Sequence, residues 1–137
     1  MPSIGAEAIL FSPDPSCYLP HRAPFLFIDR VLSRESGVSA TGEFGVPVGG
    51  GYFPPLLLVE SMAQLAGIAA GQRPGEGGVL AALGRVELPA TVVAGVRYTV
   101  HSKVIKIFGR LVMVEGEVRE SDRVIATATL TLGIGGG

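Results

Sequence analysis

The sequence predicts an α+β fold in which an antiparallel sheet of about five to six strands wraps around one long central helix. Three observations support this prediction. Two strand-like segments come early in the chain, one apolar helical segment follows at 54–72, and four strand-like segments fill the second half. A helix that is apolar on nearly every face must be covered, and the strands are the elements available to cover it. At 137 residues the chain is expected to be a single domain, 1–137.

The composition narrows the class of protein. With 11 basic and 12 acidic residues the net charge is -1, so no nucleic-acid partner is expected. Cys17 is the only cysteine, which permits no internal disulfide and fits a reducing compartment. The pattern of a signal peptide is missing, and polar residues interrupt the longest apolar run, so no membrane span is expected either. We therefore expect a cytoplasmic protein. We also expect no metal ion and no other cofactor.

The first part of the chain is predicted to be a strap followed by two strands. Residues 1–24 are rich in proline and carry only short apolar pieces, which indicates loop with at most one helical turn. The compact apolar run Phe25–Leu32 is predicted as the first strand. Val38–Val46 alternates in polarity and is predicted as the second strand, after a turn at Glu35–Gly37.

The central helix is predicted from the segment that begins Phe53-Pro-Pro. Two prolines suit the first turn of a helix, where a missing N–H has no partner to lose. From Leu56 to Gly71 the helix is apolar on nearly every face. Glu60 interrupts this run, and burying an ionised, unpaired carboxylate costs several kcal/mol. We therefore expect Glu60 to be paired, protonated or chemically active.

The second half of the chain is predicted to consist of four strands joined by short turns. Alternating polarity and β-branched residues mark the last three of them, with turns at 108–110 and 120–122. The glycine-rich residues 133–137 are expected to form a flexible tail. The four predicted strands are 79–88, 96–107, 111–119 and 124–132.

Two motifs in this order of elements resemble the β-hydroxyacyl-acyl-carrier-protein dehydratase family, which has the hot-dog fold. The first is Leu19-Pro-His-Arg-Ala-Pro-Phe-Leu-Phe-Ile-Asp-Arg-Val31, which matches the family's N-terminal signature almost residue for residue. The second is Leu56–Gln64, which is similar to the family's helix with Glu-(Ala/Ser)-Met-Ala-Gln. A weaker match is Val93–Tyr98, followed by a basic turn that includes Arg110.

The resemblance implies a dimer with two helices side by side and acyl tunnels at the subunit interface. Family members eliminate water from a 3-hydroxyacyl thioester, using a loop histidine and a helix Glu or Asp from opposite subunits. The expected partner is an acyl carrier protein or a coenzyme A thioester. A homodimer is expected, with a heterodimer or a higher oligomer as the alternatives.

Two positions depart from the pattern of that family. Glu60 matches the helix carboxylate, but counting back from it without gaps puts Val46 where the family has its histidine. No other alignment supplies one, because the chain has no histidine between His21 and His101. The family glycine that offers an N–H to the thioester carbonyl is here Pro55, which has no N–H.

The candidate catalytic residues are Glu60 and, in one of two interpretations, His21. His21 either holds the N-terminal strap through backbone hydrogen bonds or has taken over acid–base work, for which the ordinary pKa of a histidine, about 6.5, is suited. Gln64 lies one turn after Glu60 on the same face and is expected to bond Glu60, line the tunnel or pair across a dimer. His101 is expected at the surface or an interface.

Further residues are predicted to bind the substrate or a partner. The acyl group is expected to contact residues before and within the helix: Val46, Phe53, Pro55, Leu56 and Gln64. A basic rim speeds the docking of an acidic carrier protein, and Lys103, Lys106 and Arg110 form such a rim around one hairpin, unless they are simply a solvated face.

Three functions follow from these observations. The first is a dehydratase-like protein of fatty-acid or polyketide-type metabolism with a degraded or altered site, acting on 3-hydroxyacyl thioesters. The second is a catalytically silent acyl-binding module, or a subunit of a heterodimer whose partner completes the site. The third is a hot-dog thioesterase, in which Glu60 directs water to the thioester.

Overall fold

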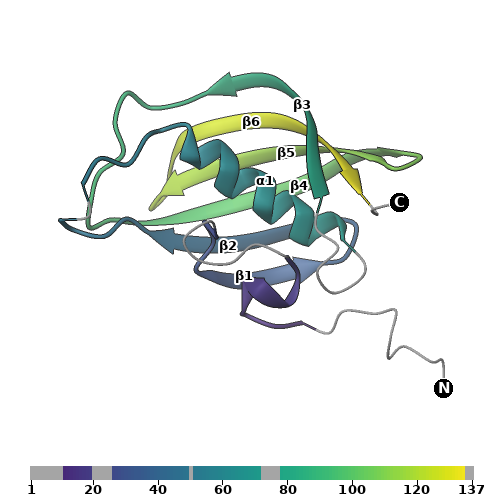
Figure 1. Ribbon diagram of the computed structural model, residues 1–137, viewed down its shortest axis with the longest axis horizontal. Helices are drawn as coiled ribbons and strands as arrows, with labels where there is room; N and C mark the ends of the chain where they lie inside the picture. The colour runs from purple at the N-terminus through teal and green to yellow at the C-terminus, as the bar shows by residue number, and fades with distance from the viewer. Residues whose placement is uncertain (1–10, 20–25, 50, 72–77, 135–137) are drawn as a thin grey trace.

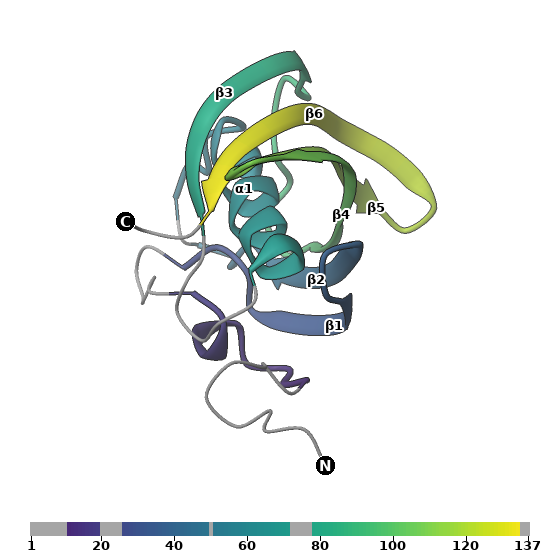
Figure 2. The ribbon, with the colours of Figure 1, turned by 90° about the vertical axis from the view of Figure 1, so that its right-hand side faces the viewer.

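The computed structural model has one helix lying across a six-stranded antiparallel sheet (Figure 1). It describes residues 11–19, 26–49, 51–71 and 78–134. The strand order is β1-β2-β4-β5-β6-β3, and the sheet curves around the helix when seen from the side (Figure 2). This confirms the predicted fold class. The elements are η1 (Pro15–Cys17), β1 (Arg30–Glu35), β2 (Ser39–Gly45), α1 (Leu57–Ala70), β3 (Gly78–Glu87), β4 (Arg97–Phe108), β5 (Leu111–Glu120) and β6 (Arg123–Ile134).

Helix α1 forms the centre of the core, as its uniform apolar sequence predicts. It is shorter than the predicted 54–72, because the carbonyls of Pro54 and Pro55 accept from Leu57 and Leu58 in a tight entering turn. Gly71 ends the helix in an extended conformation. All helix residues except Leu57 and Glu60 are buried, so nearly every face of α1 is covered.

The first strand starts later than predicted. The expected strand Phe25–Leu32 is wrong at both ends, because β1 runs from Arg30 to Glu35 and Phe25 lies outside the described residues. Ile28 is buried and the Phe27 N–H donates to a helix side chain. The start of the apolar run is therefore explained by burial in the core and by the contact with α1, and pairing with β2 begins only at the Asp29 N–H, which donates to Glu43.

The other strands lie within a few residues of their predicted bounds, with one difference at the end of the chain. β6 continues to Ile134, which pairs with Gly78, so residues 133 and 134 belong to the sheet and not to a flexible tail. In the N-terminal strap, η1 is one short turn, and the Tyr18 hydroxyl bonds the backbone of Ser12. The strap residues 1–10 and 20–24 lie outside the described part of the chain.

Several contacts hold α1 on the sheet, and two of them involve Arg34 and Gly116. At its C-terminal end the Arg34 guanidinium of β1 donates to the carbonyls of Ile68, at 2.7 Å, and Gly71, and it lies over the Tyr18 ring. Partial burial lowers the pKa of Arg34 from its ordinary value. In the middle of the helix Met62 packs on Gly116 of β5, where an added Cβ would lie 3.0 Å from the Met62 sulfur.

Candidate functional site

The candidate site is built around Glu60 in the first turn of α1. Unlike most of the helix, its side chain is only partly buried. The Gln64 Nε2 donates to Glu60 Oε2 at 2.9 Å, so the hydrogen bond expected from their spacing is present. Glu60 is therefore a paired carboxylate that retains some access to the surroundings.

Gln64 connects Glu60 to the segment that precedes β1. Its side chain is 2% exposed, and its Oε1 accepts from the Phe27 N–H at 2.7 Å. Both ends of a buried amide are thus bonded, which is the usual condition for burying such a group. The sequence gives no sign of the Phe27 partner, because every residue other than proline has a backbone N–H.

The segment that enters α1 is held by aromatic stacking. Phe53 stacks on Phe44 with ring centroids 6.0 Å apart, and Phe44 stacks on Tyr98 at 5.5 Å. Pro55 is partly buried, whereas Leu56 is 64% exposed. The acyl-binding role predicted for these residues stays a prediction.

The backbone N–H groups in the first turn of the helix are hydrogen-bonded to carbonyls of the residues that lead into the helix. The N–H groups of Leu57, Leu58 and Val59 donate to the carbonyls three residues earlier, at 54, 55 and 56. A free N–H at a helix start is the usual anion-binding group. Here these three N–H groups have internal partners, and Pro55 has no N–H at all.

Val46, the residue after β2, lines a hollow of about 380 Å³. Its side chain is 4% exposed, and its backbone pairs with Val96 and Gly95. Two charged residues of opposite sign line this hollow, Arg97 and Asp29, and the Arg97 guanidinium lies 3.9 Å from the Asp29 carboxylate. The remaining lining residues are Gly45, Pro47 and Val48.

His21 lies outside the described residues. Its two interpretations, a structural role in the strap and acid–base work beside Glu60, both stay predictions. His101 is partly exposed on β4, and its Nδ1 lies 2.8 Å from the Thr41 hydroxyl.

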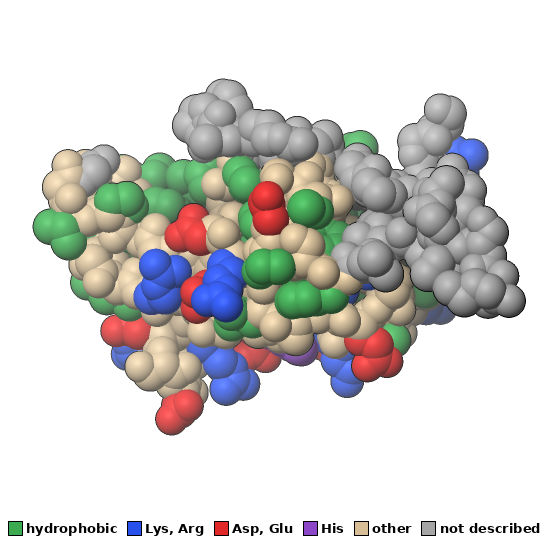
Figure 3. All heavy atoms as spheres, turned by 90° about the horizontal axis from the view of Figure 1, so that it is seen from below, with side chains coloured by type: hydrophobic (Ala, Val, Ile, Leu, Met, Phe, Trp, Pro, Cys, Tyr) green, Lys and Arg blue, Asp and Glu red, His purple; other side chains and the backbone are tan. Residues whose placement is uncertain are grey.

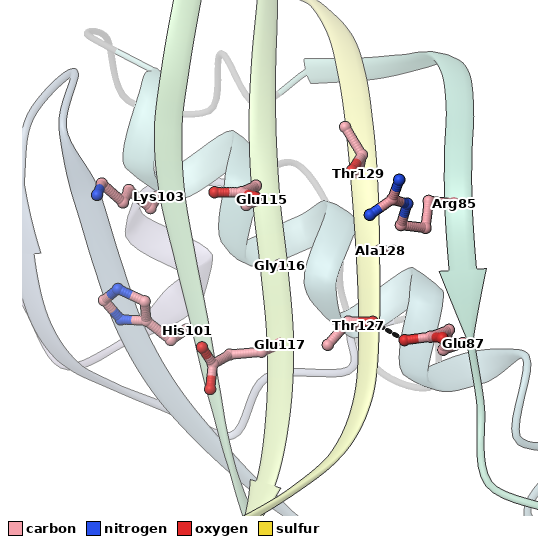
Figure 4. Close-up of a pocket in the computed structure, with 10 residues that line it drawn as sticks. All are labelled: Arg85, Glu87, His101, Lys103, Glu115, Gly116, Glu117, Thr127, Ala128 and Thr129. Carbon is pink, nitrogen blue, oxygen red and sulfur yellow. Dashed lines mark hydrogen bonds between the residues drawn. The ribbon is translucent and has the colours of Figure 1, made fainter.

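A second hollow, of about 330 Å³, lies on the sheet face that points away from α1 (Figure 4). It collects charges of both signs, among them Lys103 and Glu115 on neighbouring strands. Several of its polar groups already have partners on the sheet, such as Glu87, which accepts from Thr127 at 3.2 Å. Neither Glu60 nor Gln64 contributes to it. This hollow is therefore separate from the candidate site on α1.

The predicted basic rim begins beside α1, where Ser102, next to Lys103, donates to the Met62 carbonyl two residues after Glu60. Lys103 pairs with Ser39 at the start of β2, and Lys106 and Arg110 lie farther along the β4–β5 hairpin. Elsewhere the acidic and basic side chains are interspersed, as on the face in Figure 3.

Among the described residues, no three His, Cys, Asp or Glu side chains are grouped as metal ligands. No helix in the same part of the chain is both long and apolar enough to span a membrane.

Comparison with solved structures defines the class of protein. The dehydratase heterocomplex ApeI:P from Xenorhabdus doucetiae matches with a TM-score of 0.78 at 19% identity, over 93% of each chain. The protein smu.793 from Streptococcus mutans, bound to acetyl CoA, matches with a TM-score of 0.67 at 16% identity, over 87% of this chain and 97% of that one. Zebra fish thioesterase superfamily member 2 matches with a TM-score of 0.63 at 17% identity, over 77% and 80%. The chain is a hot-dog fold protein.

Comparison with curated sequences then gives the family. The 3-hydroxyacyl-[acyl-carrier-protein] dehydratase FabZ of Streptococcus thermophilus is 32% identical over 129 residues, which covers 85% of this chain and 92% of the relative. FabZ of Moorella thermoacetica is also 32% identical, over 85% of this chain and 91% of the relative. No protein-family model matches the chain. The chain belongs to the FabZ dehydratase family.

Proposed function

We propose that the chain is a dehydratase-like protein that binds a 3-hydroxyacyl thioester at the first turn of α1, with an altered catalytic site. The observation that carries this proposal is the partly buried Glu60, held by Gln64, in a chain 32% identical to relatives named 3-hydroxyacyl-[acyl-carrier-protein] dehydratases. In the reaction a base removes the proton alpha to the thioester carbonyl. The 3-hydroxyl group then leaves as water after protonation, and an enoyl thioester remains.

Two features of the chain explain why we propose an altered site. Elimination of water uses both a base and an acid, and a lost general acid–base group typically costs roughly 10²- to 10⁴-fold in rate. We propose that Val46, which a count back from Glu60 puts at the position of the family's histidine, replaces that histidine, and its side chain cannot transfer protons. Pro55 offers no N–H to the developing enolate oxygen, and a missing oxyanion donor costs a further ~10²- to 10³-fold. His21 remains our candidate for the second acid–base group.

We expect purified protein to convert a 3-hydroxyacyl-coenzyme A to the enoyl thioester slowly, and Glu60→Ala to lower that rate at least ~100-fold, because Glu60 is a proton-transfer group. The assay follows the absorbance of the enoyl thioester and the release of free thiol in parallel. The matched control is Glu115→Ala, which removes a carboxylate on the outer face of the sheet. Equal rates for wild type and Glu60→Ala would remove Glu60 from the mechanism.

The same assay separates the two alternatives. A catalytically silent subunit of a heterodimer is favoured by the absence of a histidine between His21 and His101, and a similar fold occurs in a dehydratase heterocomplex. If this alternative holds, the purified protein alone gives no turnover, and turnover appears once an intact family member is added. If the protein is a thioesterase, it releases free thiol, and Glu60→Gln loses this activity. The chain shares its fold with a thioesterase superfamily member.

We further propose that two chains pair through β3, an edge strand of the sheet. Every residue from Val79 to Glu87 is exposed, including Val79 at 76% and Leu83 at 45%. A long, apolar and unprotected edge strand is a ready template for a second strand. A homodimer is the simplest assembly, and a heterodimer or higher oligomer would use the same edge.

We expect Leu83→Asp to convert the dimer into a monomer of 14.2 kDa, because it places a charge in the paired edges. Sedimentation velocity measures the mass directly. Ile107→Asp is the matched control, since Ile107 is 59% exposed on a different part of the sheet and is expected to leave the dimer intact. A wild-type protein that sediments as a monomer would contradict the proposal.

The partner that delivers the acyl group is proposed to be an acyl carrier protein, with coenzyme A as the alternative carrier. Lys103, Lys106 and Arg110 are exposed and would attract an acidic carrier. A carrier docked on these residues is proposed to serve a site at the interface of two subunits. A cytoplasmic location stays a prediction.

A further inference from the structure

We propose that the Tyr52 hydroxyl donates to the thioester carbonyl the hydrogen bond that Pro55 cannot supply, which makes Tyr52 a further catalytic residue. This inference rests on the proposed function, because it names a second group of the same site. Two observations carry it. Tyr52 has the only polar side chain between residues 46 and 59, and its hydroxyl bonds no other described residue.

The segment that enters α1 has few donors to offer a substrate oxygen. Pro47, Pro54 and Pro55 have no N–H. The N–H groups of residues 57–59 already donate to the carbonyls of residues 54–56. The other side chains of this segment are glycine, aliphatic or phenylalanine, so Tyr52 is its one side-chain donor.

The three tyrosines of the chain differ in what their hydroxyl groups bind. The Tyr18 hydroxyl accepts from the Ser12 N–H at 2.6 Å, and the Tyr98 hydroxyl accepts from the Val93 N–H at 3.0 Å. Both of these tyrosines are 1% exposed, whereas Tyr52 is 76% exposed. The Tyr52 hydroxyl therefore holds no part of the described fold together and is accessible to a ligand.

The loop that carries Tyr52 is anchored on both sides. Before it, the Val46 carbonyl accepts from the Gly95 N–H at 2.7 Å, and Val48 packs so closely on Gly95 that an added Cβ would lie 2.8 Å from a Val48 methyl group. After it, Phe53 is held in the aromatic stack. These contacts fix the loop beside the turn that leads into β4 (left in Figure 1), so the exposed phenol is presented from a held segment next to the start of α1.

The chemistry of the proposed reaction gives this hydroxyl a task. When a base removes the alpha proton, the electron pair moves onto the thioester oxygen and an enolate forms. The Tyr52 hydroxyl donates a hydrogen bond to that oxygen and keeps its own proton, as tyrosine hydroxyls do in other enzymes that form enolates. The electron pair then returns to form the carbon–carbon double bond as the 3-hydroxyl group leaves as water. Glu60 thus transfers protons, while Tyr52 stabilises charge and offsets the donor lost at Pro55.

Tyr52→Phe tests this role because it removes only the hydroxyl and keeps the ring. We expect kcat for a 3-hydroxyacyl-coenzyme A to fall about 100-fold, since loss of one oxyanion donor typically costs ~10²- to 10³-fold. KM should change less than about threefold, because the hydrogen bond strengthens as charge develops, and Tm should equal that of wild type. Tyr18→Phe is the matched control, which removes the same atom from the strap and should leave kcat unchanged. Equal kcat for wild type and Tyr52→Phe would overturn the inference.

An infrared measurement tests the contact without any turnover. The probe is an enoyl-coenzyme A labelled with ¹³C at the thioester carbonyl, bound to wild type and to Tyr52→Phe. A hydrogen bond to a carbonyl lowers its stretching frequency, so we expect the band at higher frequency in Tyr52→Phe. Bands at the same frequency would contradict the role of Tyr52 even in a protein that dehydrates its substrate. A shifted band in a protein without turnover would instead overturn the proposed dehydration and leave Tyr52 as the donor to the carbonyl.

Discussion

Arg34→Met is expected to destabilise the protein by about 3 kcal/mol, because it removes the clamp at the C-terminal end of α1. Hydrogen bonds to a charged group contribute about 1.5–3 kcal/mol, and a cation at a helix C-terminus adds about 0.3–1 kcal/mol. The variant also leaves the Ile68 and Gly71 carbonyls without the guanidinium and removes its contact with the Tyr18 ring. Urea unfolding followed by circular dichroism measures the free energy of unfolding.

Two controls make this expectation specific. Arg34→Lys keeps the charge but not the forked donors, so it should recover only part of the loss. Arg123→Met removes an exposed arginine that pairs with Glu120 at 3.4 Å, and it should change the free energy of unfolding by less than about 0.5 kcal/mol. If Arg34→Met and Arg123→Met unfold at the same urea concentration, the clamp contributes nothing to stability.

Gly116→Val is expected to destabilise the protein by about 3 kcal/mol through overpacking. A Cβ at position 116 would lie 3.1 Å from the Met62 Cβ, an atom close to the helix backbone that cannot move without the helix. The branched side chain of valine adds two more carbons beyond this Cβ. Because α1 carries Glu60, the variant should also lower turnover if the helix is displaced. Thermal and urea unfolding give the stability change.

Gly84→Val on β3 is the matched control for this substitution. A Cβ there would lie 3.8 Å from Thr129, which is an ordinary contact. Both variants make the same chemical change in a strand. Both are compared in the Leu83→Asp background, where pairing through β3 is lost, so the difference between them isolates the contact with Met62. A Gly116→Val protein as stable as Gly84→Val would show that α1 can move away from β5 without loss.

The candidate site was predictable where sequence spacing determines geometry. The i, i+4 spacing of Glu60 and Gln64 predicts their hydrogen bond, which is present at 2.9 Å. The partner of the other end of Gln64 was not predictable, because the Phe27 N–H is a backbone group with no sequence signal. Arg34 was missed for a related reason, since its partners are the carbonyls of Ile68 and Gly71 at the end of a distant helix.

The sequence by itself determined the order of elements, the burial of α1 and the family. These features depend on the local periodicity of apolar residues and on motif matches, and both can be recognised in the sequence alone. Only the tertiary structure decided that Phe27 and Ile28 precede the first strand, with the Phe27 N–H bonded to α1, and that β3 is an exposed edge. It also decided that the first N–H groups of α1 are already bonded. These features depend on which backbone groups from distant parts of the chain come into contact. An apolar run has the same sequence pattern whether it is buried against a sheet or against a helix.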